Sequence, residues 1–162
     1  MSALVVYESF WGNTASVAKA IADGIGEGTP ALTTDQATAE ILAGADLVVV
    51  GGPIIAFSLA NDASRANIAN DAKAPTPADV SHPSMRSWLE GLPKGAGRFA
   101  AFETGYKMSP GATKRIAKGL KAAGYTEAAD PERFIVAGGY GPMKEGELER
   151  ARAWGATLAG TA

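Results

Sequence analysis

A polar turn that contains glycine joins an apolar run to a helical segment near the start of the chain. The apolar run is Ala3–Tyr7, the turn is Ser9–Thr14, and the helical segment is Ala15–Ile25. In α/β proteins such a turn can bind phosphate, because its backbone N–H groups lack helical partners and the helix dipole favours an anion. The turn holds no Lys, so it is not a nucleotide-binding P-loop, which requires Gly-Lys-Ser/Thr. It therefore predicts a phosphate that is held in place rather than transferred.

Each residue type in the turn fits that role. Ser9 and Thr14 can donate hydroxyls, Asn13 can donate an amide, and Gly12 lets the backbone approach closely. The pattern is not Gly-x-Gly-x-x-Gly, so the dinucleotide-binding fingerprint is missing. The alternative is an ordinary capped helix start with no ligand, since Ser, Asn and Thr are common capping residues.

Composition narrows the class of protein. With 162 residues, 46% of them hydrophobic and 20% charged, residues 1–162 are expected to form one soluble domain. The chain has 15 basic and 17 acidic side chains, which predicts no nucleic-acid partner. It has no cysteine and a single histidine, His82, so thiol catalysis and a multi-histidine metal site are excluded. No signal peptide or membrane segment is recognisable, and a cytoplasmic location is the default expectation.

Apolar runs and helical patterns alternate along the chain. Unbroken apolar runs are typical of strands that are covered on both faces. The strand candidates are Leu4–Tyr7, Leu47–Val50, Phe99–Phe102 and Phe134–Ala137, with a weaker one near Pro30–Thr33. Alternation of this kind predicts right-handed crossovers and a parallel sheet.

Five helices are expected between and after these strands. The last carries Leu148, Ala151, Trp154 and Leu158 on one stripe, which is expected to be buried. Another is expected to begin at Ser109-Pro110, an N-cap followed by a first-turn proline, and to end at Gly124. The expected positions are Ala15–Ile25, a short helix at Ile41-Leu42, Ser84–Leu92, Ser109–Gly124 and Glu145–Leu158.

The segment from about residue 58 to 81 is long for a connection in an α/β unit. It is rich in Ala, Asn and Asp, and it contains two prolines. We expect a surface excursion with a short helix or partial disorder. A lid or partner-docking loop is the functional alternative, because the segment follows a glycine-rich turn directly.

Further loops at predicted strand ends can complete a binding site. They are Gly51–Phe57, Glu103–Tyr106 and Gly138–Pro142. Ligands of open parallel sheets collect at the carboxyl ends of the strands. Aromatic residues at three loop positions suit a flat aromatic ligand; they are Trp11, Phe57 and Tyr106.

In these features the chain resembles the flavodoxin family. The similar stretches are Tyr7–Thr14, Ala45–Pro53 with an aromatic at Phe57, and Phe99–Phe102 leading into Thr104-Gly105-Tyr106. The resemblance implies a three-layer, doubly wound α/β fold with a five-stranded parallel sheet in the order 2-1-3-4-5. It also implies FMN as cofactor at the strand ends.

The resemblance implies a set of cofactor-binding residues. The phosphate would be held by the first turn, which comprises Ser9, Phe10, Trp11, Gly12, Asn13 and Thr14. The isoalloxazine would be bordered by Pro53, Ile54, Ile55, Ala56 and Phe57 on one side and by Thr104, Gly105 and Tyr106 on the other. The chain departs from the family pattern at Phe10 and Trp11, where many members have Gly and Thr, and at Ile54 and Ile55, where polar residues are common.

The resemblance predicts an FMN-binding electron carrier that works as a monomer between a reductase and an electron acceptor. No residue is expected to be catalytic and none to bind metal, because the flavin carries the chemistry. An FMN-dependent NAD(P)H:quinone-type oxidoreductase is the alternative, with residues 58–81 as the wall of a substrate pocket. A scaffold that has lost FMN also remains open, whereas a receiver domain would need an aspartate at the end of the third strand.

Several charged residues stand apart from the predicted site. Glu8 and Glu103 adjoin the ligand loops and are expected to be solvated or to cap backbone groups. His82 is expected at the surface, before a helix. Arg86 and Arg115 are expected to be solvated helix charges, as is Lys114.

Overall fold

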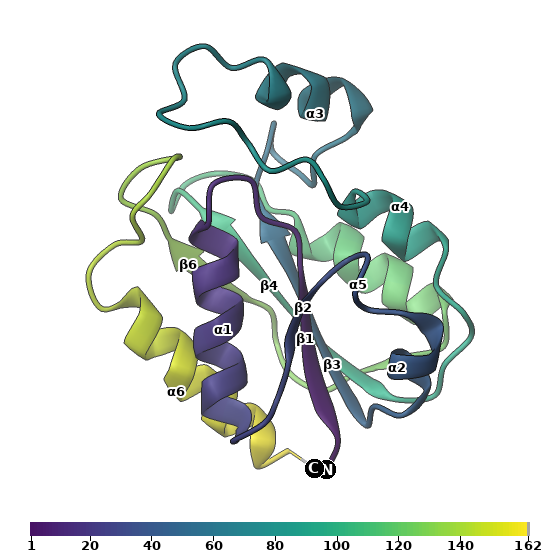
Figure 1. Ribbon diagram of the computed structural model, residues 1–162. Helices are drawn as coiled ribbons and strands as arrows, with labels where there is room; N and C mark the ends of the chain where they lie inside the picture. Colours follow the sequence, from purple (N-terminus) through teal and green to yellow (C-terminus); the bar gives the residue numbers. More distant parts are fainter. Residues whose placement is uncertain (162) are drawn as a thin grey trace.

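The apolar runs of the sequence form one parallel sheet, and the computed structural model describes it within residues 1–161 (Figure 1). The strand order is β2-β1-β3-β4, and the outer position beside β4 is shared by β5 and β6. The strands are β1 (Ala3–Tyr7), β2 (Ala31–Thr33), β3 (Leu47–Pro53), β4 (Arg98–Gly105), β5 (Thr126–Glu127) and β6 (Glu132–Ile135). The predicted order is confirmed, with its fifth position divided between two short strands.

Helices cover both faces of the sheet. In Figure 1, α1 and α6 lie on one side and α2, α4 and α5 on the other, while α3 lies beyond the strand ends. The helices are α1 (Asn13–Ile25), α2 (Ala39–Ala43), α3 (Asp62–Ala69), α4 (Met85–Glu90), α5 (Thr113–Ala122) and α6 (Glu147–Ala159).

Strand periodicity divides the core into two layers. Along β3, Val48 and Val50 face the layer with α4 and α5, and Leu47 and Val49 face the layer with α1 and α6. Successive side chains of a strand point to opposite faces, so an unbroken apolar run is buried on both sides. This explains why β1, β3 and β4 could be predicted from apolar runs, whereas the predicted run Phe134–Ala137 overlaps only the last two residues of β6.

Glycine allows α1 and α6 to pack closely. A Cβ atom on Gly155 would overlap the backbone carbonyl of Ile21, and one on Gly24 would overlap the carbonyl of Arg152. Ala151 and Leu158 continue the buried stripe of α6 on either side of Gly155. Leu148, in the first turn of α6, belongs to this stripe by helical spacing but is 39% exposed, so the prediction that it is buried is wrong.

The predicted start of α5 at Ser109-Pro110 is also wrong. The helix begins at Thr113, whose N–H donates to Glu103 Oε1 at 3.3 Å. The buried carboxylate of Glu103, near the end of β4, therefore caps the helix. Its negative charge also interacts favourably with the positive end of the helix dipole. Ser109 instead lies in a turn, with its N–H on the carbonyl of Tyr106.

The close contact between α1 and α6 predicts that Gly155→Ala destabilises the protein, by about 1–3 kcal/mol, because the added methyl meets fixed backbone. Helix propensity alone predicts the opposite sign, by about 1 kcal/mol. Urea denaturation of the two proteins measures the difference.

Gly44→Ala is the matched control, since its Cβ would lie 3.8 Å from the carbonyl oxygen of Ile41 and its φ is −90°. We expect this variant to change the free energy of unfolding by less than about 0.5 kcal/mol. A Gly155→Ala protein as stable as the wild type would contradict the packing described.

Candidate functional site

The first turn leaves the amino end of α1 open. Gly12 has a φ of 104°, the left-handed conformation that favours glycine, and its N–H donates to Ser9 Oγ at 3.2 Å. No side chain caps α1, and its first turn has no acidic residue. Within residues 1–161, the N–H groups of Asn13, Thr14 and Ala15 have no hydrogen-bond partner. These N–H groups and the helix dipole can therefore stabilise an anion.

Side chains of the turn tie it to loops from other strands. Thr14 Oγ1 lies 2.8 Å from Thr104 Oγ1, and both hydroxyls are buried. Asn13 Nδ2 donates to the carbonyl of Gly138 at 3.2 Å. The ends of β1, β4 and β6 are thus linked by polar groups on one edge of the sheet.

A cavity of about 400 Å³ opens between these loops. It lies at the carboxyl ends of the strands, the usual ligand position in an open parallel sheet. The residues that were predicted to bind the cofactor and that do line this cavity are Ser9, Phe10, Trp11, Asn13, Thr14, Pro53, Ile54, Ile55, Thr104, Gly105 and Tyr106. Three other predicted residues, Gly12, Ala56 and Phe57, do not line it.

Ala56 and Phe57 instead form a strained turn beside the cavity. The N–H of Ile55 donates to the carbonyl of Ser58, and the reverse bond closes the turn. Both central residues have positive φ angles, 47° and 68°. Turns of this type favour Gly or Asn at these positions, and an L side chain costs about 1–2 kcal/mol there. The turn leaves the Phe57 side chain 69% exposed.

The predicted set of cofactor-binding residues lacks four residues that line the cavity: Asp71, Val136, Gly139 and Tyr140. Tyr140 Oη lies 2.5 Å from Asp71 Oδ2, and the Tyr140 ring packs edge-on against Trp11 with centroids 4.8 Å apart. The hydrogen bond lowers the pKa of Asp71 and raises the pKa of Tyr140. The Gly138–Pro142 turn in the sequence pointed to the Tyr140 loop, but no sequence signal marked Asp71.

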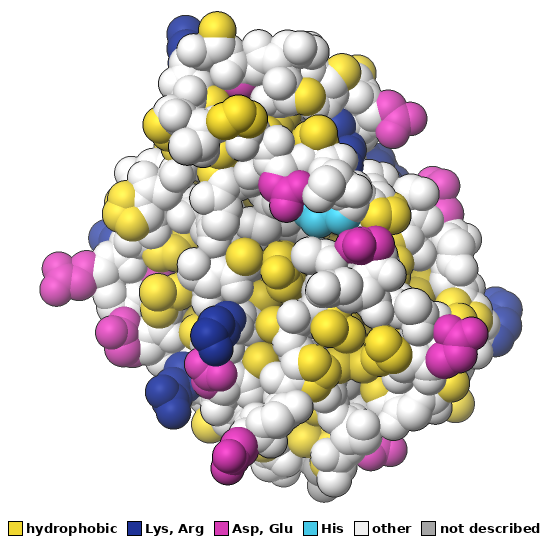
Figure 2. Space-filling model, viewed as in Figure 1, with side chains coloured by type: hydrophobic (Ala, Val, Ile, Leu, Met, Phe, Trp, Pro, Cys, Tyr) yellow, Lys and Arg dark blue, Asp and Glu magenta, His cyan; other side chains and the backbone are white. Residues whose placement is uncertain are grey.

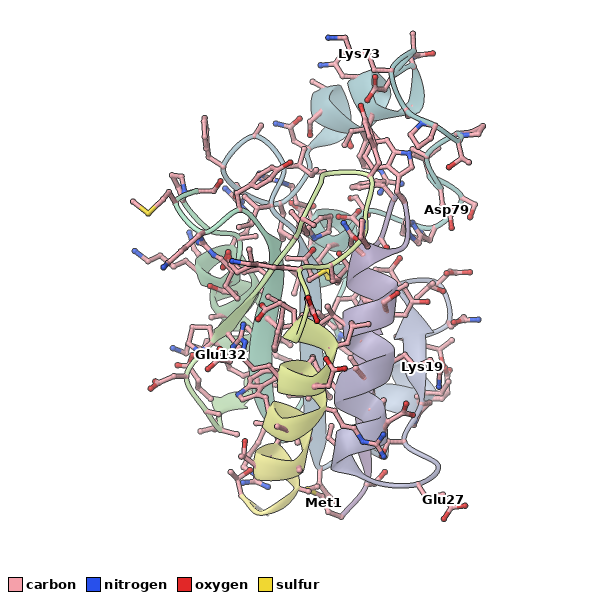
Figure 3. The ribbon with its side chains drawn as sticks, turned by 90° about the vertical axis from the view of Figure 1, so that its left-hand side faces the viewer. Met1, Lys19, Glu27, Lys73, Asp79 and Glu132 are labelled. Carbon is pink, nitrogen blue, oxygen red and sulfur yellow. The ribbon has the colours of Figure 1, made fainter. Side chains whose placement is uncertain are left out.

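We call residues 58–81 the cap segment. It contains α3 and forms a lobe above the sheet (Figure 2). Figure 3 shows Lys73 and Asp79 of this segment at the end of the molecule opposite to Met1. Trp11 Nε1 donates to the carbonyl of Thr76 at 3.1 Å, and the N–H of Asp79 donates to the carbonyl of Phe10 at 2.8 Å. The cap segment is therefore attached to the first turn of the site.

A buried ion pair adds a further attachment. Arg65 in α3 donates through Nη1 to Glu8 Oε2 at 2.6 Å and through Nη2 to the carbonyl of His82 at 2.7 Å. The guanidinium also lies 5.5 Å from the ring centroid of Phe10. Glu8 is fully buried and additionally accepts the N–H of Met85. Burial raises the pKa of Glu8, while Met85 and Arg65 act to lower it.

The expectation that His82 lies at the surface is wrong, because the residue is 4% exposed. Of the two roles expected for Glu8, it is not solvated but does accept a backbone N–H, that of Met85. Neither ring nitrogen of His82 has a hydrogen-bond partner among residues 1–161, and Glu8 Oε1 also lacks one. Both side chains are enclosed where the cap segment meets the first turn, a contact between residues distant in sequence.

Glu103 plays a similar role on the other side of the cavity. It is 3% exposed and pairs with Arg133, whose Nη2 lies 3.1 Å from Glu103 Oε2. Arg133 Nη1 also donates to the carbonyls of Tyr106 and Lys107. Glu103 is therefore not solvated; it caps the backbone of α5 and, through Arg133, helps to hold the Tyr106 loop.

The cavity itself carries little charge. Among the cavity-lining residues of the described chain, Asp71 is the one charged residue, and none is Lys or Arg. An anionic group here would have to be stabilised by N–H groups, hydroxyls and the α1 dipole. The apolar and aromatic part of the lining, which includes Ile54, Ile55 and Tyr106, suits a flat hydrophobic group.

The Glu8–Arg65 pair predicts that Arg65→Met destabilises the protein by about 3 kcal/mol at neutral pH, because a buried carboxylate loses its partner. The folded-state pKa of Glu8 is already raised, and losing Arg65 raises it further. The loss of stability should therefore be larger at neutral pH than below pH 4.5, the ordinary pKa of Glu. Denaturation at both pH values measures this difference.

Adding Glu8→Gln to the Arg65→Met protein should recover part of the loss at neutral pH, since no buried charge remains. Arg152→Met is the control, because Arg152 is exposed and makes no ion pair among residues 1–161. An equal loss at both pH values with no recovery in the double variant would show that the pair does not hold the cap segment.

Solved structures of known proteins share this architecture. Flavodoxin 2 from Bacillus cereus matches with a TM-score of 0.70 at 16% identity, over 100% of both chains. A flavodoxin from the domain Archaea matches with a TM-score of 0.67 at 20% identity, over 99% of this chain and 97% of that one. A flavodoxin, WrbA-like protein from Agrobacterium tumefaciens matches with a TM-score of 0.60 at 19% identity, over 98% and 94%.

Comparison by sequence, unlike comparison by structure, finds no similar protein. No protein-family model and no curated protein matches the chain. The strand order, the helical layers and the fit to whole flavodoxin chains agree with one another. The chain therefore has the flavodoxin-like fold.

Proposed function

We propose that the protein binds FMN and carries electrons between redox partner proteins. One observation carries the proposal: the open amino end of α1 and an apolar, aromatic slot belong to the same cavity. FMN combines these two chemistries, a phosphate and a flat ring system. The similarity to two flavodoxins supports the same cofactor.

The phosphate end is assigned to the first turn. The free N–H groups of Asn13, Thr14 and Ala15 would donate hydrogen bonds to the phosphate, and the hydroxyls of Ser9 and Thr14 would add further donors. The cavity offers no cation, so binding would rest on oriented dipoles. The negative charge of Asp71 is expected to repel a phosphate, and the hydrogen bond from Tyr140 is expected to reduce this repulsion by partly neutralising the carboxylate.

The ring end is assigned to the loops after β3 and β4. A Cβ on Gly105 would lie 2.7 Å from Ile54 Cδ1, so glycine lets the Ile54 side chain lie against the Gly105 backbone. Tyr106 is 55% exposed, and its loop is fixed by Arg133. When bound, FMN would supply reversible electron transfer, while these loops would bind it, orient it and limit its contact with water.

An FMN-dependent NAD(P)H:quinone-type oxidoreductase is the second candidate. The cap segment favours it, because the segment attaches to Trp11 and contributes Asp71 to the cavity wall. The resemblance to a WrbA-like protein is compatible with it. The electron carrier is preferred because the other whole-chain neighbours described above are flavodoxins.

Within the described chain, no helix combines the length and apolar character that crossing a membrane requires.

Several expectations about partners, oligomeric state and location remain predictions. The reductase, the electron acceptor and the monomeric state are proposed on the resemblance alone, and the cytoplasmic location is proposed as the default expectation from the sequence.

The cofactor is tested by titrating the protein with FMN and following quenching of flavin fluorescence. Thr14→Val should weaken FMN binding about tenfold, equivalent to about 1.4 kcal/mol, because a buried hydroxyl is lost beside the phosphate position. Thr157→Val is the control, since its hydroxyl bonds within α6 and is exposed. A wild-type protein that does not bind FMN would overturn the proposal, and an unchanged Thr14→Val affinity would overturn the phosphate position.

The two candidate functions differ in their need for a partner. The carrier should oxidise NAD(P)H slowly in the presence of a quinone, yet pass electrons rapidly to oxidised cytochrome c after chemical reduction. Rapid NAD(P)H oxidation by the FMN-loaded protein without a reductase would establish the oxidoreductase instead.

A further inference from the structure

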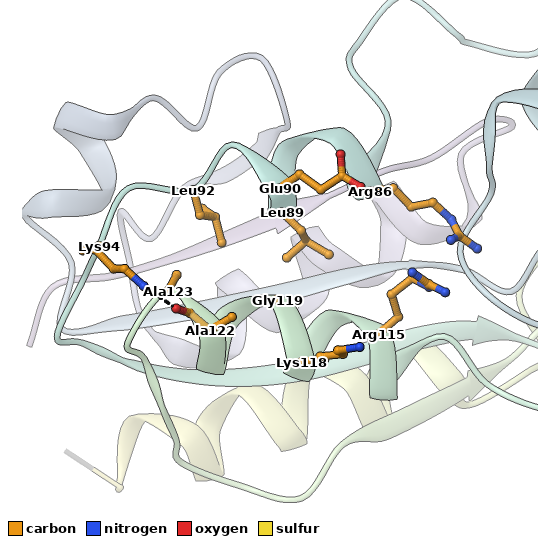
Figure 4. A pocket seen from close by; sticks show the side chains of 10 residues that line it. All are labelled: Arg86, Leu89, Glu90, Leu92, Lys94, Arg115, Lys118, Gly119, Ala122 and Ala123. Atoms are coloured by element: carbon orange, nitrogen blue, oxygen red, sulfur yellow. Dashed lines mark hydrogen bonds between the residues drawn. The ribbon is translucent and has the colours of Figure 1, made fainter.

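A second hollow lies away from the cavity, between α4 and α5. It has a volume of about 370 Å³, within the range of small-molecule sites. Figure 4 shows its side chains, which come from both helices and from the connection after α4. Its lining residues are Arg86, Leu89, Glu90, Leu92, Lys94, Arg115, Lys118, Gly119, Ala122 and Ala123. We call it the α4–α5 groove.

Positive charge gathers at one end of this groove. In Figure 4 the side chains of Arg86 and Arg115 lie at one end, and that of Lys118 lies between this end and the middle of the groove. Within residues 1–161, none of the three makes a salt bridge, and Glu90 is the one acidic residue in the groove lining. The sequence of α5 carries four basic residues and no acidic one, although the whole chain has a net charge of −2.

Arg86 is held in place rather than solvated, which corrects the expectation from the sequence. Its Nε and Nη2 donate to the carbonyl of Leu59 at 3.0 and 2.8 Å. Burial and the neighbouring charge of Arg115 lower the pKa of Arg86, while Glu8 and Glu90 act to raise it. Neither guanidinium forms a salt bridge within residues 1–161, so a bound anion would stabilise this pair of like charges.

The rest of the groove is apolar. Leu89 and Leu92 contribute one wall, and Ala122 and Ala123 contribute the other. A Cβ on Gly119 would lie 3.1 Å from Leu89, so glycine sets the close approach of α5 to α4. Lys94, at the far end, is engaged with the carbonyl of Ala122 at 2.6 Å. The groove therefore combines a cationic end with an apolar floor.

We propose that the α4–α5 groove binds a small organic phosphate whose apolar body lies on Leu89 and Leu92. A phosphate dianion matches the number of cations better than a single carboxylate does, and arginine forks bind phosphate oxygens in pairs. The size of the groove favours a small molecule over a protein segment, which would need a much larger buried surface. This site is independent of the cavity at the strand ends.

The proposal is tested by titrating the protein with phenyl phosphate and following backbone amide shifts by NMR. The amides of residues 86–92 and 115–123 should shift together in a saturable way. The double variant Arg115→Gln, Lys118→Gln should weaken this binding about tenfold, because two charge-assisted contacts are lost. The readout is local to the groove, so it does not depend on whether FMN binds the cavity.

Lys114→Gln is the matched control. Lys114 adjoins Arg115 on α5 and is exposed, but it does not line the groove, so the affinity should change less than about twofold. An equal loss in this control would overturn the proposal in favour of diffuse electrostatic attraction. Equal shifts with phenol would reduce the groove to an apolar surface, and tighter binding of a tri-glutamate peptide would assign it to an acidic protein segment instead.

Discussion

The in-register pairing of β1, β3 and β4 is the constraint on which the site depends. Tyr7 pairs with Gly51, and Pro53 pairs with Thr104, so the loops after these strands emerge at one edge. Parallel strands must return through helices, which places every connection of one kind at the same end of the sheet. A slip of one residue would exchange the side chains that the strand presents to the two helical layers and would separate Thr14 from Thr104.

Two buried carboxylates fix the positions of the segments that adjoin these strands. Glu8 follows β1 and holds Arg65 of the cap segment, and Glu103 near the end of β4 holds Arg133 and the start of α5. A buried ion pair contributes little net stability, but breaking it leaves an uncompensated charge. The pairs therefore act mainly by fixing the positions of segments that lack large apolar contacts. α3 illustrates this, because none of its residues is buried.

Local pattern was enough to predict three main strands and most helices, and the resemblance to the flavodoxin family predicted the strand order and much of the cavity lining. Apolar runs found β1, β3 and β4 because both faces of these strands are covered, and the first turn was recognisable from Gly12 and its polar neighbours. The errors arose where distant residues decide the outcome. Glu103, not Ser109, sets the start of α5, and Asp71 reaches the cavity only because the cap segment folds over it. No local pattern encodes such contacts, which join residues many positions apart.

The central claim is that uncharged donors at the start of α1 recognise a phosphate attached to a flavin. It is tested most directly by comparing the affinities of FMN and riboflavin at low and at high ionic strength. The account predicts that FMN binds more tightly by about a factor of one hundred or more, equivalent to about 2.8 kcal/mol, and that the ratio changes little with salt. Equal affinities, or a preference for FMN that disappears at high ionic strength, would contradict it.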